Sequence, residues 1–122
     1  MLSEKELQNI IRLEASRKGI HLWRNNSGAA YMRDGRLLRY GLANDSGILN
    51  ESIKSSDLVG IKPVIITENM IGRMIGQFIS VEIKNSEWRY TGTKPEIAQK
   101  RWIDLIISLG GEAGFINKEG TL

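Results

Sequence analysis

The chain has 122 residues, 41% of them hydrophobic, with no cysteine and a single histidine. This length and composition predict one domain, spanning residues 1–122, with a hydrophobic core of its own. They exclude disulfides, zinc–thiolate sites, cysteine nucleophiles and clusters of histidine ligands. The net charge of +3 does not identify a partner. The apolar runs are too short to span a membrane, so we expect a soluble, cytoplasmic protein.

The chain opens with the pattern of a helix. Ser3 and Glu6 have the spacing of a capping box, and apolar residues then follow at helical intervals. Gly19 is a typical helix stop. The pattern predicts a helix over residues 3–18.

Short strands are expected next. "IHLWRN" at 20–25 alternates well enough for one strand, and "YMRDGRLLRY" at 31–40 carries Asp34-Gly35 at its centre. An Asp-Gly pair between apolar residues favours a type I′ hairpin turn. Residues 41–56 are polar and contain glycine, which predicts a loop.

Two longer apolar segments come in the second half of the chain. "DLVGIKPVIIT" at 57–67 and "RMIGQFISVEIK" at 73–84 are strand candidates joined by the short link "ENMIG". The short connection predicts that they are neighbours in one sheet.

The last third predicts a helix and a final strand. Thr93 and Glu96 have capping-box spacing, and Pro95 falls in the first turn, where its missing N–H does no harm. The helix should end at Gly110-Gly111, and "EAGFIN" at 112–117 can supply a short strand. The order of elements predicts a compact α/β domain around a mixed sheet flanked by helices.

The stretch "FISVEIKN" at 78–85 places Glu82 and Lys84 on one face of a strand, because strand side chains alternate. One interpretation is an amphipathic strand with a solvated polar face. The other is a site in which the acid holds a metal ion and the lysine acts on a water or an oxyanion.

Further polar residues favour the second interpretation. Asp57 opens the preceding strand candidate and Gln99 lies in the following helix, and acidic residues of the first helix are Glu4, Glu6 and Glu14. Two carboxylates from neighbouring strands can hold a divalent cation for phosphoryl transfer. With oxygen ligands alone, the expected cofactor is Mg²⁺ or Mn²⁺.

Basic residues are concentrated in the first third of the chain, over 12–39: Arg12, Arg17, Lys18, Arg24, Arg33, Arg36 and Arg39. Arginine forks suit a phosphate backbone, whereas a solvated surface would give the same count. Nothing has the pattern of a nucleotide-binding phosphate loop, so no nucleotide cofactor is expected.

The order Asp57, then Glu82-Ile83-Lys84, then Gln99 resembles the PD-(D/E)XK nuclease superfamily. More narrowly, the chain resembles the VRR-NUC family in its small stand-alone form, often found in phages. The matching phrases cover nearly the whole chain: "SEKELQ", "WRNNSG", "YGLANDSGILNESIKSSDLVGI", "FISVEIKN" and "PEIAQKRWIDLIISLGGEAGFI".

The resemblance implies a restriction-endonuclease-like fold and assigns the site. Asp57 and Glu82 match the metal-binding acids, with the backbone carbonyl of Ile83 as a further ligand; Lys84 matches the catalytic lysine and Gln99 the active-site glutamine. A glutamate of the first helix also belongs to the family's site. The resemblance favours Glu4, which stands four residues before Gln8 as in the family's motif. Glu6 and Glu14 stay open as alternatives, although Glu6 has a capping role and Glu14 could be a buried, paired core acid.

Contacts with DNA are expected from the basic and amide residues Arg24, Asn25, Asn26, Arg33, Arg36, Arg39 and Arg89. Arg24, Asn25 and Asn26 could instead tie down the turn before Gly28. In the loop after Lys84, Trp88 and Tyr90 either stack on DNA or pack beneath the loop.

The predicted function is therefore an Mg²⁺- or Mn²⁺-dependent DNA endonuclease of a bacterial or phage-infected cell. The stand-alone form implies a homodimer acting on branched DNA, as Holliday-junction resolvases do, since two matched cuts need two sites. Two alternatives stay open: a flap, nicking or non-specific endonuclease with the same chemistry, and a non-catalytic DNA-binding protein.

Overall fold

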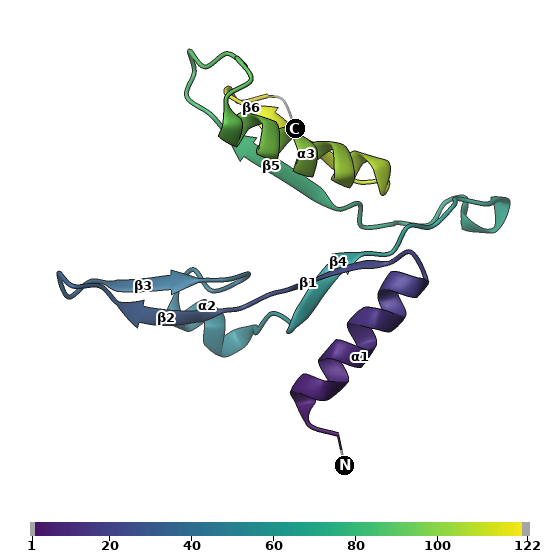
Figure 1. The fold of residues 1–122 in the computed structure, drawn as a ribbon, viewed down its shortest axis with the longest axis horizontal. Helices are drawn as coiled ribbons and strands as arrows, with labels where there is room; N and C mark the ends of the chain where they lie inside the picture. Colours follow the sequence, from purple (N-terminus) through teal and green to yellow (C-terminus); the bar gives the residue numbers. More distant parts are fainter. Residues whose placement is uncertain (1, 121–122) are drawn as a thin grey trace. The chain divides into compact units, whose positions relative to one another are not determined.

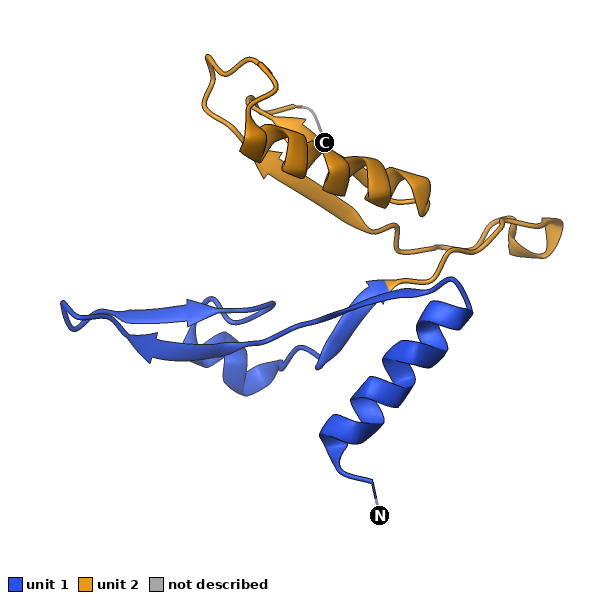
Figure 2. Cartoon of the chain, in the orientation of Figure 1, with its two compact units in different colours: residues 1–60 blue, residues 61–122 orange. Residues whose placement is uncertain are grey.

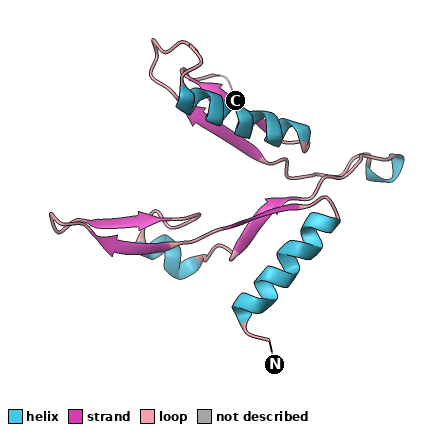
Figure 3. Cartoon of the chain, in the orientation of Figure 1, coloured by secondary structure: helices cyan, strands magenta, loops and turns pink. Residues whose placement is uncertain are grey.

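The computed structural model describes residues 2–120 and has a mixed α/β architecture, as the sequence predicts (Figures 1 and 3). The chain divides into two compact units, residues 1–60 and 61–122 (Figure 2), and each is described by itself. None of the helices in the described part is long and apolar enough to cross a membrane.

The elements of the first unit are α1 (Glu4–Arg17), β1 (His21–Arg24), β2 (Gly28–Tyr31), β3 (Leu37–Tyr40), α2 (Gly47–Ser52) and β4 (Leu58–Ile61), whose last residue falls at the unit boundary. The second unit has a 3₁₀ turn, η1 (Glu68–Met70), then β5 (Ile79–Ile83), α3 (Lys94–Ser108) and β6 (Glu112–Ile116).

Helix α1 begins and ends where the sequence predicts. The Ser3 hydroxyl accepts from the Glu6 N–H, and the Glu6 carboxylate accepts from the Ser3 N–H at 2.8 Å. This reciprocal pair satisfies two of the donors that a helix N-terminus leaves open. The chain turns away at Gly19, which has a φ of +72°.

The hairpin forms, but the predicted type I′ turn is wrong. Such a turn needs positive φ at both central residues, whereas only Gly35 has it, with φ +85°. The Met32 N–H donates to the Arg36 carbonyl, and the Gly35 N–H donates to the Met32 carbonyl. These bonds close a loop that is longer than a two-residue turn. Within it, the Asp34 carboxylate accepts from the Arg36 N–H and pairs with its guanidinium.

The region predicted as a loop over 41–56 contains the short helix α2. Its N-cap is Ser46, whose hydroxyl accepts from the Leu49 N–H. The polar, glycine-containing composition conceals this helix, since a single serine cap and one turn carry little periodic signal.

The two long strand candidates, 57–67 and 73–84, contain only the shorter strands β4 and β5. Strand β4 ends at Ile61, two residues before Pro63, which has no N–H for a strand ladder. The expected pairing of these segments is not among the strand pairs of residues 2–120, which are β1 with β4, β2 with β3, and β5 with β6. Three two-stranded sheets thus stand in place of one mixed sheet.

The second unit is built around a β–α–β arrangement. Strands β5 and β6 run parallel, with Glu82 opposite Phe115 and Ile83 opposite Ile116, and α3 connects them. Pro95 lies in the first turn of α3, and the helix is followed by Gly110 with φ +93°, as the sequence predicts. A parallel pair needs such a crossover, so the helix that follows the candidate site is held against β5 and β6.

Candidate active site

Strand β5 presents its polar side chains, not its apolar ones, to helix α3. Ser80, Glu82 and Lys84 are half-buried, and the Ser80 hydroxyl accepts from the indole N–H of Trp102 on α3 at 2.9 Å. On the other face, Val81 and Ile83 are exposed. The side chain of Lys84 is 18% exposed and that of Glu82 is 42% exposed. The acid and the lysine therefore lie beneath a helix.

A side-chain amide from α3 bridges the acid and the lysine. Gln99 donates through Nε2 to Glu82 Oε1 at 3.0 Å and accepts at Oε1 from Lys84 Nζ at 2.9 Å. Lys84 Nζ lies 4.0 Å from Glu82 Oε1. The amide thus turns its donor to the carboxylate and its acceptor to the ammonium, which is the orientation that the two charges favour.

Helical spacing explains why Gln99 reaches β5. Glu96, Ile103 and Ile106 are the buried residues of α3, and Gln99 lies among them at intervals of three and four. Ile106 is completely buried. The apolar residues that fasten α3 to the sheet thereby fix the amide over Glu82 and Lys84.

The backbone of Ile83 faces the edge of β5 that points away from β6. The Lys84 N–H donates to the Ile116 carbonyl, and the Phe78 carbonyl accepts from the Glu112 N–H, both at 2.9 Å. In a parallel pair, alternate residues bond to a given neighbour, so the even-numbered residues of β5 face β6. The Ile83 carbonyl is thus directed to the opposite edge.

The Lys84 ammonium also lies near two aromatic rings. Its Nζ is 5.5 Å from the ring centroid of Trp88 and 5.7 Å from that of Phe115. The two rings lie 4.8 Å apart between centroids. Trp88 is half-buried, which agrees with the interpretation that it packs beneath its loop, while Tyr90 is 43% exposed.

Glu96 is the residue whose part in this region the sequence did not reveal. Its carboxylate accepts from the Thr93 N–H at 2.9 Å and from the Trp88 indole N–H at 2.7 Å, and also from Thr91. The backbone bond from Thr93 is the main cause that lowers the pKa of Glu96 from 4.5 to about 2. The capping-box spacing predicts the Thr93 contact, but nothing in the sequence marks Trp88 as a partner.

Asp57 and Glu4 belong to the first unit. Asp57 is exposed and directly precedes β4, and its backbone carbonyl accepts from the Asn25 N–H at 2.9 Å. Glu4 is exposed in the first turn of α1 and lines a concavity of about 570 Å³ with Gln8, Arg12 and Arg24, among others. The structure therefore brings together Glu82, Lys84 and Gln99 within one unit.

The other two glutamates of α1 have local partners. Glu6 caps the helix, as predicted. Glu14 is not a buried core acid: its side chain is 56% exposed and pairs with Lys18 at 2.8 Å. The hydrogen bond and charge of Lys18 lower the pKa of Glu14.

The residues expected to contact DNA fall into two groups. The first group has partners within the fold: Asn25 donates to Ser55 and Ser56 and accepts from the Leu42 N–H, Arg36 pairs with Asp34, and Arg39 donates to Asn44. The second group is exposed: Arg24, Asn26, Arg33 and Arg89. The bonds of Asn25 fit a role in tying down the loops around it.

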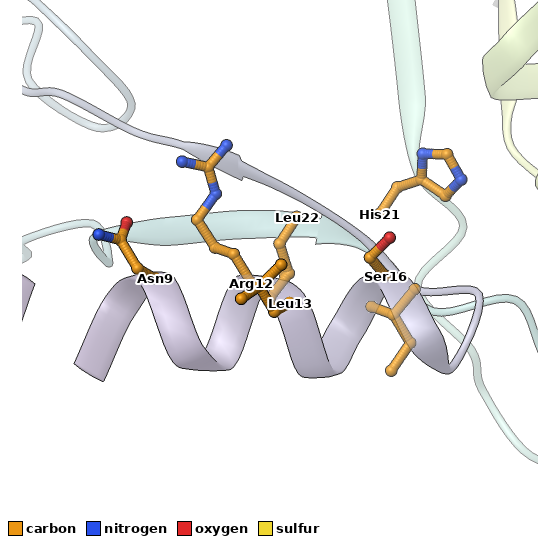
Figure 4. A pocket seen from close by; sticks show the side chains of 7 residues that line it. Asn9, Arg12, Leu13, Ser16, His21 and Leu22 are labelled. Carbon is orange, nitrogen blue, oxygen red and sulfur yellow. The ribbon is translucent and has the colours of Figure 1, made fainter. Parts of the chain in front are cut away.

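Two concavities differ in their relation to the site. One of about 520 Å³ lies between α1 and β1 and is lined by Arg12 and His21, among others (Figure 4), but by none of the residues assigned to catalysis. The other, of about 320 Å³, lies between β5 and α3 and includes Glu82 and Gln99 in its walls.

The comparisons leave the family open. Neither a scan against protein-family models nor searches of curated proteins and solved structures found a match to this chain. Within residues 2–120, no group of three or more His, Asp or Glu side chains is placed to hold a metal ion together. The cluster of Glu82, Lys84 and Gln99 at β5 and α3 is therefore the feature from which a function can be inferred.

Proposed function

We propose that the protein is a metal-dependent DNA endonuclease of restriction-endonuclease-like fold, and that Glu82, Lys84 and Gln99 belong to its active site. One observation carries the proposal: the acid–lysine face of β5 is covered by α3 and linked through Gln99. The Lys84 ammonium loses hydration there, and its hydrogen bond to Gln99 and the nearby Glu82 carboxylate offset that cost.

Each side chain has a role that its contacts support. Lys84 donates one hydrogen bond to Gln99, and its other N–H groups donate none to the described residues. They can therefore orient an attacking water or stabilise the charge that builds on phosphate. Gln99 keeps the ammonium beside the carboxylate without letting the two form a closer ion pair. The lysine thus stays directed at a substrate.

The oxygen donors at this site fit Mg²⁺ or Mn²⁺. Glu82 Oε2 has no hydrogen-bond partner among the described residues, and the Ile83 carbonyl faces the open edge of β5. Both are ligands that hard cations prefer. Such an ion, when bound, polarises a phosphodiester and makes water more acidic.

The expected substrate is branched DNA, and the expected assembly is a homodimer. The exposed arginines Arg24, Arg33 and Arg89 support phosphate binding, since guanidinium groups pair with phosphate oxygens. Two copies related by a two-fold axis would place one site on each of two opposite strands of a four-way junction.

The experiment is cleavage of a labelled four-way junction and of its linear duplex control, with Mn²⁺ present. We would compare the wild type, Lys84→Ala and the matched control Lys100→Ala, which removes an exposed lysine paired with Asp104 on α3. We expect Lys84→Ala to lower kcat at least about 100-fold while DNA binding in Ca²⁺ is unchanged, since an electrostatic group of the transition state is lost.

Three outcomes separate the alternatives. Paired cuts in the junction alone support junction resolution. Equal cleavage of flap, nicked and linear substrates would support a nuclease without a preference for junctions. Binding without cleavage of any substrate, unaffected by Mn²⁺ or Mg²⁺, would identify a non-catalytic DNA-binding protein. Sedimentation equilibrium measures whether the active species is a dimer.

A further inference from the structure

The position of Lys84 depends on more than its hydrogen bond to Gln99. A lysine side chain has four rotatable bonds, and one hydrogen bond at its end restricts them only in part. Lys84 is nonetheless 18% exposed, against 63% for Lys18 and 52% for Lys100, which also have bonded partners. The rings of Trp88 and Phe115 lie beside it, in addition to Gln99 of α3.

These two rings lie close to the ammonium of Lys84. Both centroids are within the range of about 6 Å in which a ring attracts a cation. Phe115 is fixed because it belongs to β6, directly opposite Glu82 in the sheet register. Trp88 belongs to the loop between β5 and α3, so its position needs other support.

Glu96 supplies that support from the first turn of α3. Its carboxylate accepts the indole N–H of Trp88 at 2.7 Å and is itself held by the backbone of Thr93 and Thr91. The side chain of Glu96 is only 6% exposed. A second bond, from Asn117 Nδ2 to the Trp88 carbonyl at 3.4 Å, ties the loop to the residue after β6.

We propose that Trp88 is a positioning residue for Lys84: Glu96 fixes the indole, and the indole and Phe115 together hold the ammonium where it reaches Gln99 and a substrate phosphate. The proposal rests on the proposed nuclease function for its catalytic consequence. The position of the lysine beside the two rings can be measured without any substrate.

The first measurement is a ¹H–¹³C spectrum of the full chain. A lysine methylene above an aromatic ring is shifted upfield, so the ε-CH₂ signal of Lys84 should lie upfield of those of the exposed lysines. Loss of that signal in Lys84→Ala assigns it. The upfield shift should decrease in Trp88→Leu, which leaves the ring of Phe115 beside the lysine. It should remain largely in Trp88→Phe, which keeps a ring, and should remain in Trp23→Leu.

The second measurement is the kinetics of DNA cleavage by the same variants. We expect Trp88→Leu to lower kcat roughly 10- to 100-fold with KM and DNA affinity unchanged, because a displaced catalytic group costs rate and not binding. Trp88→Phe should recover part of the rate. Trp23→Leu, which removes an equally large, half-buried indole from the first unit, is the control.

The outcomes distinguish this proposal from the function on which it rests. A Lys84 signal without an upfield shift in the wild type overturns the arrangement, whatever the activity. An upfield shift with undiminished kcat in a folded Trp88→Leu overturns the positioning role. A wild type that shows the shift but cleaves no DNA overturns the nuclease and, with it, the catalytic role of Trp88. Three results together support the proposal. The wild type shows the upfield shift, Trp88→Leu weakens both the shift and kcat, and Trp88→Phe recovers part of kcat.

Discussion

The Lys84 ammonium donates a 2.9 Å hydrogen bond to the side-chain oxygen of Gln99, and the same amide donates to Glu82. The bond joins the strand β5 to the helix α3, elements that lie against one another in the second unit. It makes the position of the lysine depend on how the helix is packed.

Removing the side-chain amide of Gln99 should therefore lower the rate of DNA cleavage and leave DNA affinity almost unchanged. In Gln99→Ala, Lys84 and Glu82 lose their bridge and are free to form a direct ion pair, which turns the ammonium away from substrate. We expect kcat to fall roughly 10- to 100-fold with little change in DNA affinity. Gln77→Ala is the matched control, since that amide bonds to the Gly110 carbonyl. Equal losses in both variants would argue against a bridging role.

The Glu96 network should make stability depend on pH at the acidic end. The folded-state pKa of Glu96, about 2, is below its ordinary value of 4.5, so the unfolded chain binds the proton more readily. Its contribution is present above about pH 4.5 and is lost as the pH falls toward 2. Urea unfolding of the wild type and Glu96→Gln should show a stability difference that is largest above pH 5 and shrinks on acidification. Glu6→Gln, which breaks the exposed capping box of α1, is the reference. A difference that stays constant down to pH 2 would contradict this account.

The pairing of β1 with β4 should not tolerate a side chain at position 60. A Cβ on Gly60 would lie 1.8 Å from the His21 carbonyl oxygen and 2.8 Å from the Leu22 Cα, both of which belong to backbone. We expect Gly60→Ala to lower the free energy of unfolding by about 3 kcal/mol or more, since the strands must move apart.

The control for Gly60→Ala is Gly114→Ala in β6, where no atom lies within 4 Å of the added carbon. Thermal or urea unfolding should show little change there, and a slight gain is expected from the lower entropy of the unfolded chain. Similar stabilities for the two variants would show that β1 and β4 are not so closely paired.

The buried side chain of Asn44 should hold the base of the hairpin. Its Nδ2 donates to the carbonyls of Gly28 at 2.7 Å and Tyr40 at 2.9 Å, and its Oδ1 accepts from Arg39 at 3.2 Å. Asn44→Ala leaves these groups without their partner and should cost about 2 kcal/mol of unfolding free energy. Asn50→Ala, the control, removes only an exposed hydrogen bond from Lys54 and should cost a few tenths of that loss of unfolding free energy. Urea titration of both variants measures the difference.

Local patterns determined the helices α1 and α3. Ser3 with Glu6 and Thr93 with Glu96 each form the capping box that their spacing predicts, because all the groups involved lie within one turn. The same locality explains the failure at 31–40. Asp34-Gly35 permits several turns, and the contact of Asp34 with Arg36 selected a longer one than the type I′ turn.

The pairing of strands needed the tertiary structure. The segments 57–67 and 73–84 are apolar enough for strands, but apolar character does not state a partner. Pro63 ended one ladder early, and the crossover through α3 placed β6 beside β5. Choosing between pairings depends on contacts far apart in sequence, which periodicity does not encode.

Local patterns likewise predicted one part of the candidate site, and tertiary packing decided the rest. The alternation of a strand by itself put Glu82 and Lys84 on one face, and helical spacing placed Gln99 in line with Ile103 and Ile106. Only the packing of α3 on β5 decided that this face is the covered one, and only the folding back of the loop brought Trp88 between Lys84 and Glu96. Side-chain direction is a local property of the backbone, whereas burial and bonded partners depend on which distant elements meet.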